Sequence, residues 1–348
     1  MARRSGDVAY AATRAKTRRN QLLPGDAYAR MLLMEIPEIS RVLGEAVYRP
    51  EMEAMATRFR GVDLLEEATQ ANLARTYREV LSFSRGPLRE QVALYLRRWD
   101  LWNVKTILRG KFARAPADEI RADLIPAGEL SPAFLDELLE AGSAAGVVEA
   151  LKGTPFHEPL ARALADSGQG EAVKNLMPLE NRLDRLYYET LLARRPATRA
   201  DALFRDFVRV EVDVVNLRTL LRMKADDQPA EKVREFLLAG GKYLKPELLR
   251  RLAEAPAAEV PGLLRGTPLA GALSPLEQDP RATGKALRAL EKFHLSKARA
   301  FGHAYPLSAL PVLDLLLRKK NEVDNIRIIA RGKEAGMGEE EIREQLVM

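Results

Sequence analysis

Three stretches of the chain carry carboxylate, carboxamide and basic side chains at one repeated spacing, the kind of set from which a catalytic cluster can be built. In each stretch an acidic residue is followed three positions later by asparagine, and basic residues follow at two, six and eight positions after that asparagine. The copies are Asp100, Asn103, Lys105, Arg109 and Lys111, then Asp213, Asn216, Arg218, Arg222 and Lys224, and finally Glu322, Asn325, Arg327, Arg331 and Lys333.

The repetition itself argues against catalysis, because a catalytic cluster is expected once, in one cleft. On a helix turning about 100° per residue, the acid and the asparagine share the apolar stripe, while the first two basic residues project from the opposite side. Asparagine is a poor residue inside a helix unless its amide finds partners, so we expect it to bridge to a neighbouring helix or loop backbone. The last two basic residues should favour the negative end of the helix dipole. We interpret the motif as a packing device.

The similarity extends beyond the motif. The sequence Lys152-Gly153-Thr154-Pro155-Phe156 returns 113 residues later as Arg265-Gly266-Thr267-Pro268-Leu269, with a weaker echo at Tyr48-Arg49-Pro50. A fixed period this long indicates small helical subdomains instead of the short units of a solenoid. We therefore predict three tandem repeats, over residues 1–113, 114–225 and 226–348.

Composition supports helices and argues against several classes of enzyme. Of the 348 residues, 47% are hydrophobic but only 6% aromatic, and alanine, leucine, glutamate and arginine dominate. The absence of cysteine excludes disulfides, thiolate catalysis and cysteine-bound metals. No phosphate-binding loop or dinucleotide motif occurs, and the three histidines lack metal-ligand spacing. We expect no catalytic, cofactor or metal site. No signal peptide or apolar run of about 18 residues is present either, which predicts a soluble, cytoplasmic protein.

The periodicity predicts an all-α protein in which clusters of short helices alternate with pairs of long antiparallel ones. Each pair is expected to carry the motif on its second helix, and a loop is expected over 266–282. The expected helices are 7–21, 27–34, 37–47, 50–58, 63–84, 88–113, 117–123, 132–141, 144–152, 158–166, 178–195, 199–225, 230–238, 246–254, 257–264, 284–302, 307–335 and 339–347.

The net charge of +6 is concentrated at the N-terminus. Residues 1–20 hold six basic residues against Asp7, so the rest of the chain is nearly neutral. A solvated basic helix accounts for this distribution, and docking to an acidic partner protein or to anionic lipid is the functional alternative. No nucleic-acid-binding module is recognisable.

The chain resembles a known family in the residues around all three motif copies. These are Trp99-Asp100-Leu101-Trp102-Asn103, Glu211 to Arg218, and Lys319 to Lys333, together with Tyr10, Arg14-Ala15-Lys16 and Leu22-Leu23 near the N-terminus. The pattern is similar to the C subunit of archaeal and bacterial V/A-type ATPases, whose eukaryotic counterpart is the d subunit of the V-ATPase. The resemblance covers about residues 7 to 347.

This resemblance implies a funnel-shaped helical protein with pseudo-threefold symmetry and a central opening. Such a protein lies peripherally on the cytoplasmic face of the membrane, on the rotor ring of proteolipid c/L/K subunits. It receives the central shaft, which is made of the D and F subunits, and transmits torque for proton or sodium transport. It has no active site of its own.

Two other functions are alternatives to the rotor coupler. A helical scaffold or adaptor unrelated to ATPases would form an open superhelix. A nucleic-acid-binding protein would show steeply salt-dependent affinity for DNA or RNA. The triple repeat and the lack of catalytic motifs favour the coupler, and neither nucleic acid nor membrane insertion is expected.

Overall fold

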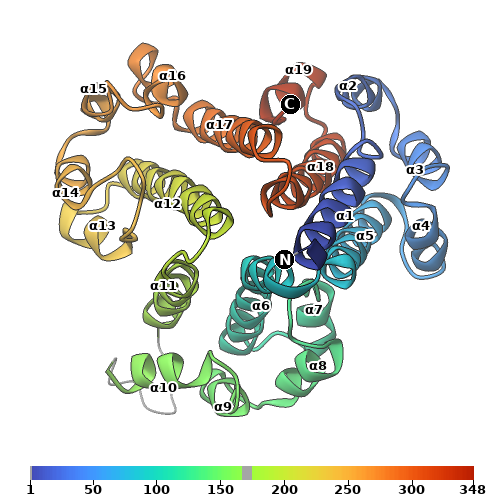
Figure 1. Cartoon of the computed structure of the whole chain (residues 1–348). Helices are drawn as coiled ribbons and strands as arrows, with labels where there is room; N and C mark the ends of the chain where they lie inside the picture. Colours follow the sequence, from blue (N-terminus) through green and yellow to red (C-terminus); the bar gives the residue numbers. More distant parts are fainter. Residues whose placement is uncertain (1, 167–174) are drawn as a thin grey trace. The chain divides into compact units, whose positions relative to one another are not determined.

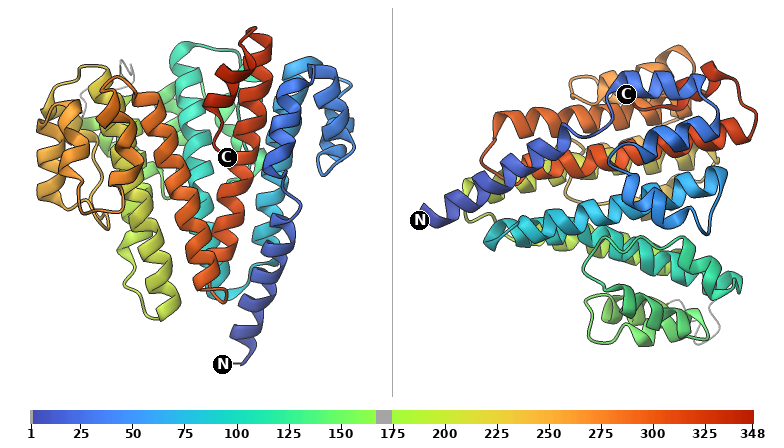
Figure 2. Two further views of the ribbon diagram at one scale, coloured as in Figure 1. Left: turned by 90° about the horizontal axis from the view of Figure 1, so that it is seen from above. Right: turned by 90° about the vertical axis from the view of Figure 1, so that its right-hand side faces the viewer.

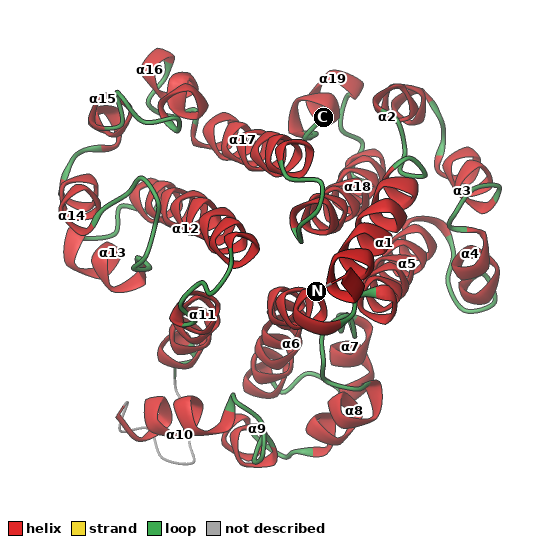
Figure 3. Cartoon of the chain, viewed as in Figure 1, coloured by secondary structure: helices red, strands yellow, loops and turns green. Residues whose placement is uncertain are grey.

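The computed structural model describes residues 2–166 and 175–348, and all regular structure in that part is helical (Figure 3). This confirms the predicted all-α class. The helices are α1 (Ala2–Arg19), α2 (Gly25–Leu33), α3 (Ile36–Gly44), α4 (Arg49–Met55), α5 (Gly61–Phe83), α6 (Gly86–Ala113), α7 (Ala117–Ala122), α8 (Pro132–Glu140), α9 (Ala144–Ala150), α10 (His157–Asp166), α11 (Met177–Ala193), α12 (Arg199–Ala225), α13 (Ala230–Phe236), α14 (Pro246–Glu254), η1 (Ala257–Glu259), α15 (Val260–Leu263), η2 (Ala270–Leu273), α16 (Ser274–Gln278), α17 (Thr283–Ala304), α18 (Leu310–Glu334) and α19 (Glu339–Gln345).

One predicted loop is wrong. The segment 266–282 contains the short helices η2 and α16. Leu273 and Leu276 from this segment are buried, which ties both helices to the core. Pro275 lies in the first turn of α16, where the missing N–H is tolerated. The many proline and glycine residues of this segment led us to expect a loop. Its two short helices are stabilised by packing against the core more than by helix propensity.

The chain divides into two compact units that are described separately. Unit 1 comprises residues 2–69 and 195–348, and unit 2 comprises residues 70–166 and 175–194, so one boundary falls within α5. No helix in the described residues is long and apolar enough to span a membrane.

The described residues of unit 1 include two hydrophobic cores. The first lies between α12, the short helices α13 to α16, and the start of α17, and includes Leu217, Leu252 and Leu290. The second joins α18 and α19 to the early helices α2 to α4 and to the start of α5. Helices α17 and α18 run side by side, and α1 lies along α18 (Figures 1 and 2). Residues from the two ends of the sequence therefore share one core.

Unit 2 repeats the same combination of long and short helices. Helix α6 packs against α11, and the short helices α7, α8 and α9 contact α6 (Figure 1). Buried residues of α6 include Val104, Ile107 and Leu108. Its N-terminus carries Pro87, and its C-cap Arg114 adopts a left-handed conformation that ends the helix.

The repeated Gly-Thr-Pro sequence forms the same turn in both units. Gly153 and Gly266 have φ values of 84° and 87°, a region that glycine adopts without steric cost. The hydroxyl of Thr154 donates to the Leu151 carbonyl at 2.7 Å, and that of Thr267 donates to the Leu264 carbonyl at 2.8 Å. The sequence similarity thus corresponds to a shared local structure.

Candidate functional site

The three motif copies lie on the long helices α6, α12 and α18, with their acidic and amide side chains buried. Relative exposure is at most 1% for Asp100, Asn103, Asp213, Asn216, Glu322 and Asn325. Such burial of polar groups is costly unless every group is hydrogen-bonded. The partners of these side chains therefore decide what the motif does.

Each asparagine forms two hydrogen bonds with one backbone residue located 22 positions further along the chain. The Asn103 amide donates to the Ile125 carbonyl at 2.8 Å and accepts from the Ile125 N–H at 2.8 Å. Asn216 makes the same pair with Leu238, at 2.9 and 2.7 Å, and Asn325 with Val347, at 3.0 and 3.1 Å. The side-chain amide thus pairs with both backbone groups of one residue, as a neighbouring β-strand would. That residue follows a short helix.

Replacing Asn216 by alanine should lower the free energy of unfolding by about 1–3 kcal/mol, because the buried N–H and carbonyl of Leu238 lose their partner. Chemical denaturation of the full chain measures this change. Asn321 is half-buried on α18 and makes a single hydrogen bond, to the Val347 carbonyl at 2.8 Å. As a control, N321A should have the smaller effect. Equal stability of N216A and the wild type would contradict the role given to this amide.

The acidic residues of the first two copies hold the next part of the same loop. Asp100 accepts hydrogen bonds from the N–H groups of Glu129 and Leu130, both at 2.9 Å. Asp213 accepts from the N–H groups of Lys242, Tyr243 and Leu244, at 2.8 to 3.0 Å. Both carboxylates are therefore bound by backbone donors and have a structural role.

A glycine allows each loop to approach its carboxylate. Gly128 and Gly241 occur 28 positions after Asp100 and Asp213, respectively. A Cβ atom added to Gly128 would lie 2.1 Å from Asp100 Oδ1, and one added to Gly241 would lie 2.0 Å from Asp213 Oδ1. No side chain fits at either position without displacing the loop.

The G241A substitution should therefore destabilise the protein by about 1–3 kcal/mol, the usual cost of overpacking a filled site. Thermal unfolding compared with G271A, where an added Cβ meets no atom within 4 Å, measures the effect. A melting temperature of G241A equal to or above that of G271A would show that the loop relaxes freely.

The third acidic residue has different partners. Glu322 accepts from the Leu23 N–H at 2.5 Å, from the Tyr48 hydroxyl at 2.5 Å and from Lys319 at 2.7 Å. Lys319 also donates to the Tyr48 hydroxyl at 2.9 Å and is only 2% exposed. Burial, followed by the charge of Glu322, raises the pKa of Tyr48 well above its usual value, so this phenol stays protonated as a donor. Glu322 thus attaches the N-terminal segment to α18.

The final lysine of each copy reaches the C-terminal end of a short helix. Lys111 donates to the Leu139 carbonyl at the end of α8, Lys224 to the Ala253 carbonyl of α14 at 2.9 Å, and Lys333 to the Leu32 carbonyl of α2 at 2.7 Å. The ammonium group satisfies a terminal carbonyl and lies at the negative end of that helix. The sequence predicted a role at the dipole of the motif helix, whereas the contact is with another helix.

The other two basic residues connect the motif helix to a second long helix in two of the three copies. Lys105 pairs with Asp184 at 2.5 Å and Arg109 with Glu180 at 2.6 Å, both on α11. Arg327 and Arg331 pair with Glu66 of α5, and Arg331 also pairs with Asp63. Arg218 and Arg222 in the second copy form no ion pair with any described residue, although Glu291 of α17 lies in the same pocket.

The geometry brings together the acid, the amide and the final lysine of each copy around one loop and one short helix. Sequence reasoning did not connect Leu23 and Tyr48 with Glu322, because these contacts join distant parts of the chain. It also missed the pairing of Lys319 with Glu322, which lies one helical turn away. It missed Gly128 and Gly241 as well, although both lie 28 positions after the acidic residue of their copy and the sequence shows this spacing. The described residues contain no cluster of three or more metal-ligating histidine, cysteine or acidic side chains.

Comparison with known proteins agrees with this architecture. The profile of the ATP synthase (C/AC39) subunit family matches residues 11–345. The C subunit of the A-type ATP synthase of Halobacterium salinarum is 40% identical over 97% of both chains. The C subunits of the A-type ATP synthases of Methanococcoides burtonii and Archaeoglobus fulgidus are each 35% identical, over 99% and 98% of this chain and 95% and 96% of theirs. The chain therefore belongs to the ATP synthase (C/AC39) subunit family, a non-catalytic part of the rotary ATPase.

Proposed function

We propose that this protein belongs to the central stalk of an A-type ATP synthase and couples the rotating shaft to the membrane rotor ring. In this role it binds the D and F subunits of the shaft on one side and the proteolipid ring on the other. It lies peripherally on the cytoplasmic face of the membrane. Torque passes through it during ATP-linked transport of protons or sodium ions.

The main support for the proposal is that one packing motif, in which a long helix is hydrogen-bonded to a loop and to a short helix, occurs three times in a member of this family. In each copy a long helix holds a loop through its asparagine and a short helix through its lysine. Buried hydrogen bonds to backbone resist the relative sliding of helices, because any displacement exposes unpaired polar groups. A torque-transmitting part needs this resistance to shear.

The proposed arrangement has three repeats, over residues 1–113, 114–225 and 226–348, around a central opening. In the third copy, the short helix that receives the motif lysine is α2, from the N-terminal segment. The Glu322 contacts attach the same segment to α18. These contacts join the first and last parts of the chain within unit 1.

Co-assembly tests the coupling role. The full chain is mixed with the purified D and F subunits of the shaft and with the detergent-solubilised ring, and the mixtures are separated by size-exclusion chromatography. We expect the shaft and the ring to elute together only when the chain is present. Binding to neither component, or equal association of shaft and ring without the chain, would contradict the proposal.

A further inference from the structure

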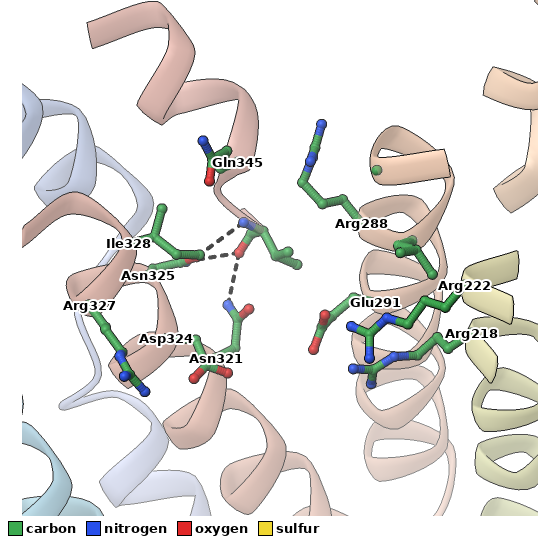
Figure 4. A pocket seen from close by; sticks show the side chains of 13 residues that line it. Arg218, Arg222, Arg288, Glu291, Asn321, Asp324, Asn325, Arg327, Ile328 and Gln345 are labelled. Atoms are coloured by element: carbon green, nitrogen blue, oxygen red, sulfur yellow. Dashed lines mark hydrogen bonds between the residues drawn. The ribbon is translucent and has the colours of Figure 1, made fainter. Parts of the chain in front are cut away.

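Unit 1 has a partly open groove of about 350 Å³ between α12 and α17 on one side and α18 with the C-terminal segment on the other (Figure 4). Arg218 and Arg222 of α12 and Arg288 of α17 line it, together with Glu291 and Leu287. Arg218 and Arg222 are the two basic residues of the second motif copy. Their surroundings can therefore be compared with those of the same positions in the other copies.

In the first and third copies, the corresponding basic residues are neutralised by acids on a neighbouring long helix. Glu180 and Asp184, four positions apart on α11, bind Arg109 and Lys105. Glu66 of α5 binds both Arg331 and Arg327. In these two copies the basic residues are thus bound by a neighbouring helix that presents carboxylates about one turn apart.

In the second copy the neighbouring long helix is α17, which has an acid at only one of the two equivalent positions. Glu180 directly follows buried Leu179, and Glu66 directly follows buried Leu65. When the fully buried Leu179 and Leu183 of α11 are aligned with Ala286 and Leu290 of α17, Leu287 takes the position of Glu180 and Glu291 takes that of Asp184. Glu291 lines the groove with Arg218 and Arg222 but forms no ion pair with either.

The groove consequently contains an excess of positive charge. The side chains of Arg218, Arg222 and Arg288 form no hydrogen bond or ion pair with any described residue. Glu291 is the one acid among the first nine residues of α17. Arg327 and Asp324, on the opposite wall, are already paired with Glu66 and Lys320.

We propose that this groove binds an acidic helix of a partner protein that presents two carboxylates about one turn apart. Such a helix would give Arg218 and Arg222 the partners that α11 and α5 give to the other copies, and Leu287 would contact its apolar atoms. A free phosphate would make no use of Leu287, whereas a helix would pack apolar atoms against it. The proposal concerns this face alone and does not depend on torque transmission.

Peptide binding to the full chain tests the proposal. The probes are alanine-based helical peptides with two glutamates, two glutamines or two lysines four positions apart, measured by fluorescence anisotropy at low ionic strength. We expect the glutamate peptide to bind the wild type at least about tenfold more tightly than the glutamine peptide. The R218E/R222E variant should lose this binding and gain affinity for the lysine peptide.

Two further variants control for folding and for general charge effects. R251E/R265E changes the same charge at exposed positions of unit 1 and should bind the glutamate peptide like the wild type. L287E should form the missing internal pair, so it should melt no lower than the wild type while binding the glutamate peptide about tenfold more weakly.

Several results would overturn the proposal. One is undetectable binding of the glutamate peptide up to about 1 mM, and another is equal binding to the wild type and R218E/R222E. The third is binding of inorganic phosphate or of anionic phosphatidylserine vesicles that depends on Arg218 and Arg222 in the absence of peptide binding. That result would make the groove a site for simple anions or lipid instead.

Discussion

The E322A variant is expected to lose about 3–5 kcal/mol of unfolding free energy, the usual cost of leaving a buried charge without its partner. Glu322 and Lys319 are both at most 2% exposed, and Lys319 Nζ lies 2.7 Å from Glu322 Oε1. Removal of the carboxylate also leaves the Leu23 N–H and the Tyr48 hydroxyl without their acceptor. Urea denaturation followed by circular dichroism measures the loss.

Two variants separate the charge effect from a general loss of packing. E341A removes an exposed glutamate on α19 and should change stability by no more than about 0.5 kcal/mol. K319M/E322L replaces both charges with apolar groups and should be more stable than E322A, because no uncompensated charge remains buried. If E322A stayed within about 0.5 kcal/mol of the wild type, Glu322 would not anchor the N-terminal segment.

The second large effect is a pH dependence that arises at Asp100. Burial raises the pKa of Asp100 to about 6 from an ordinary value of 3.8, although the N–H groups of Glu129 and Leu130 oppose the shift. The folded state therefore holds this proton more tightly than the unfolded state. The resulting stability is present below about pH 4 and is lost as the pH rises through about 6, with a total change of about 3 kcal/mol.

Comparison with D100N isolates this contribution, because asparagine does not titrate. The unfolding free energy of the wild type minus that of D100N should fall by about 2.4 kcal/mol between about pH 4 and pH 7. Subtraction removes the titration of all other groups that the two proteins share. A difference that stays constant or rises over this range would show that the pKa of Asp100 is not raised by burial.

Much of the helical structure could be predicted from the sequence because long amphipathic helices have strong periodic signals. The motif helix α12 begins with Thr198 and Asp201, which form a capping box, and its predicted range of 199–225 equals the observed one. Short helices such as α16 give weaker signals. Their burial depends on contacts with α17 and η2 that no local pattern contains.

The interior of the motif was only partly predictable. An asparagine beside an apolar stripe, such as Asn103, was expected to find amide partners on a neighbouring helix or on loop backbone, and the structure shows loop backbone. Which loop residue would bind could not be read from one copy, although the constant separation of 22 positions is evident once the structure is known. The contacts of Glu322 with Leu23 and Tyr48 were not predictable, because these residues lie 299 and 274 positions away in the sequence.

The three copies share one sequence pattern but differ in the ion pairs that their basic residues form. Arg109, Arg222 and Arg331 are equivalent in sequence. Among the described residues, the first and third form ion pairs with an acid on a neighbouring long helix, and Arg222 does not. The difference arises on another helix, at Leu287, far from the motif in sequence. A repeat therefore predicts the packing that its copies share, and the structure identifies where one copy departs from it.

Rotation of this protein in an active complex tests its proposed role most directly. The chain has no cysteine, so R265C at an exposed position gives one attachment point on it for a bead, with the catalytic head of the complex fixed to a surface. We predict that ATP drives stepwise rotation of the bead in one direction. A bead that stays still while the same complexes hydrolyse ATP would contradict the assignment of this chain to the rotor.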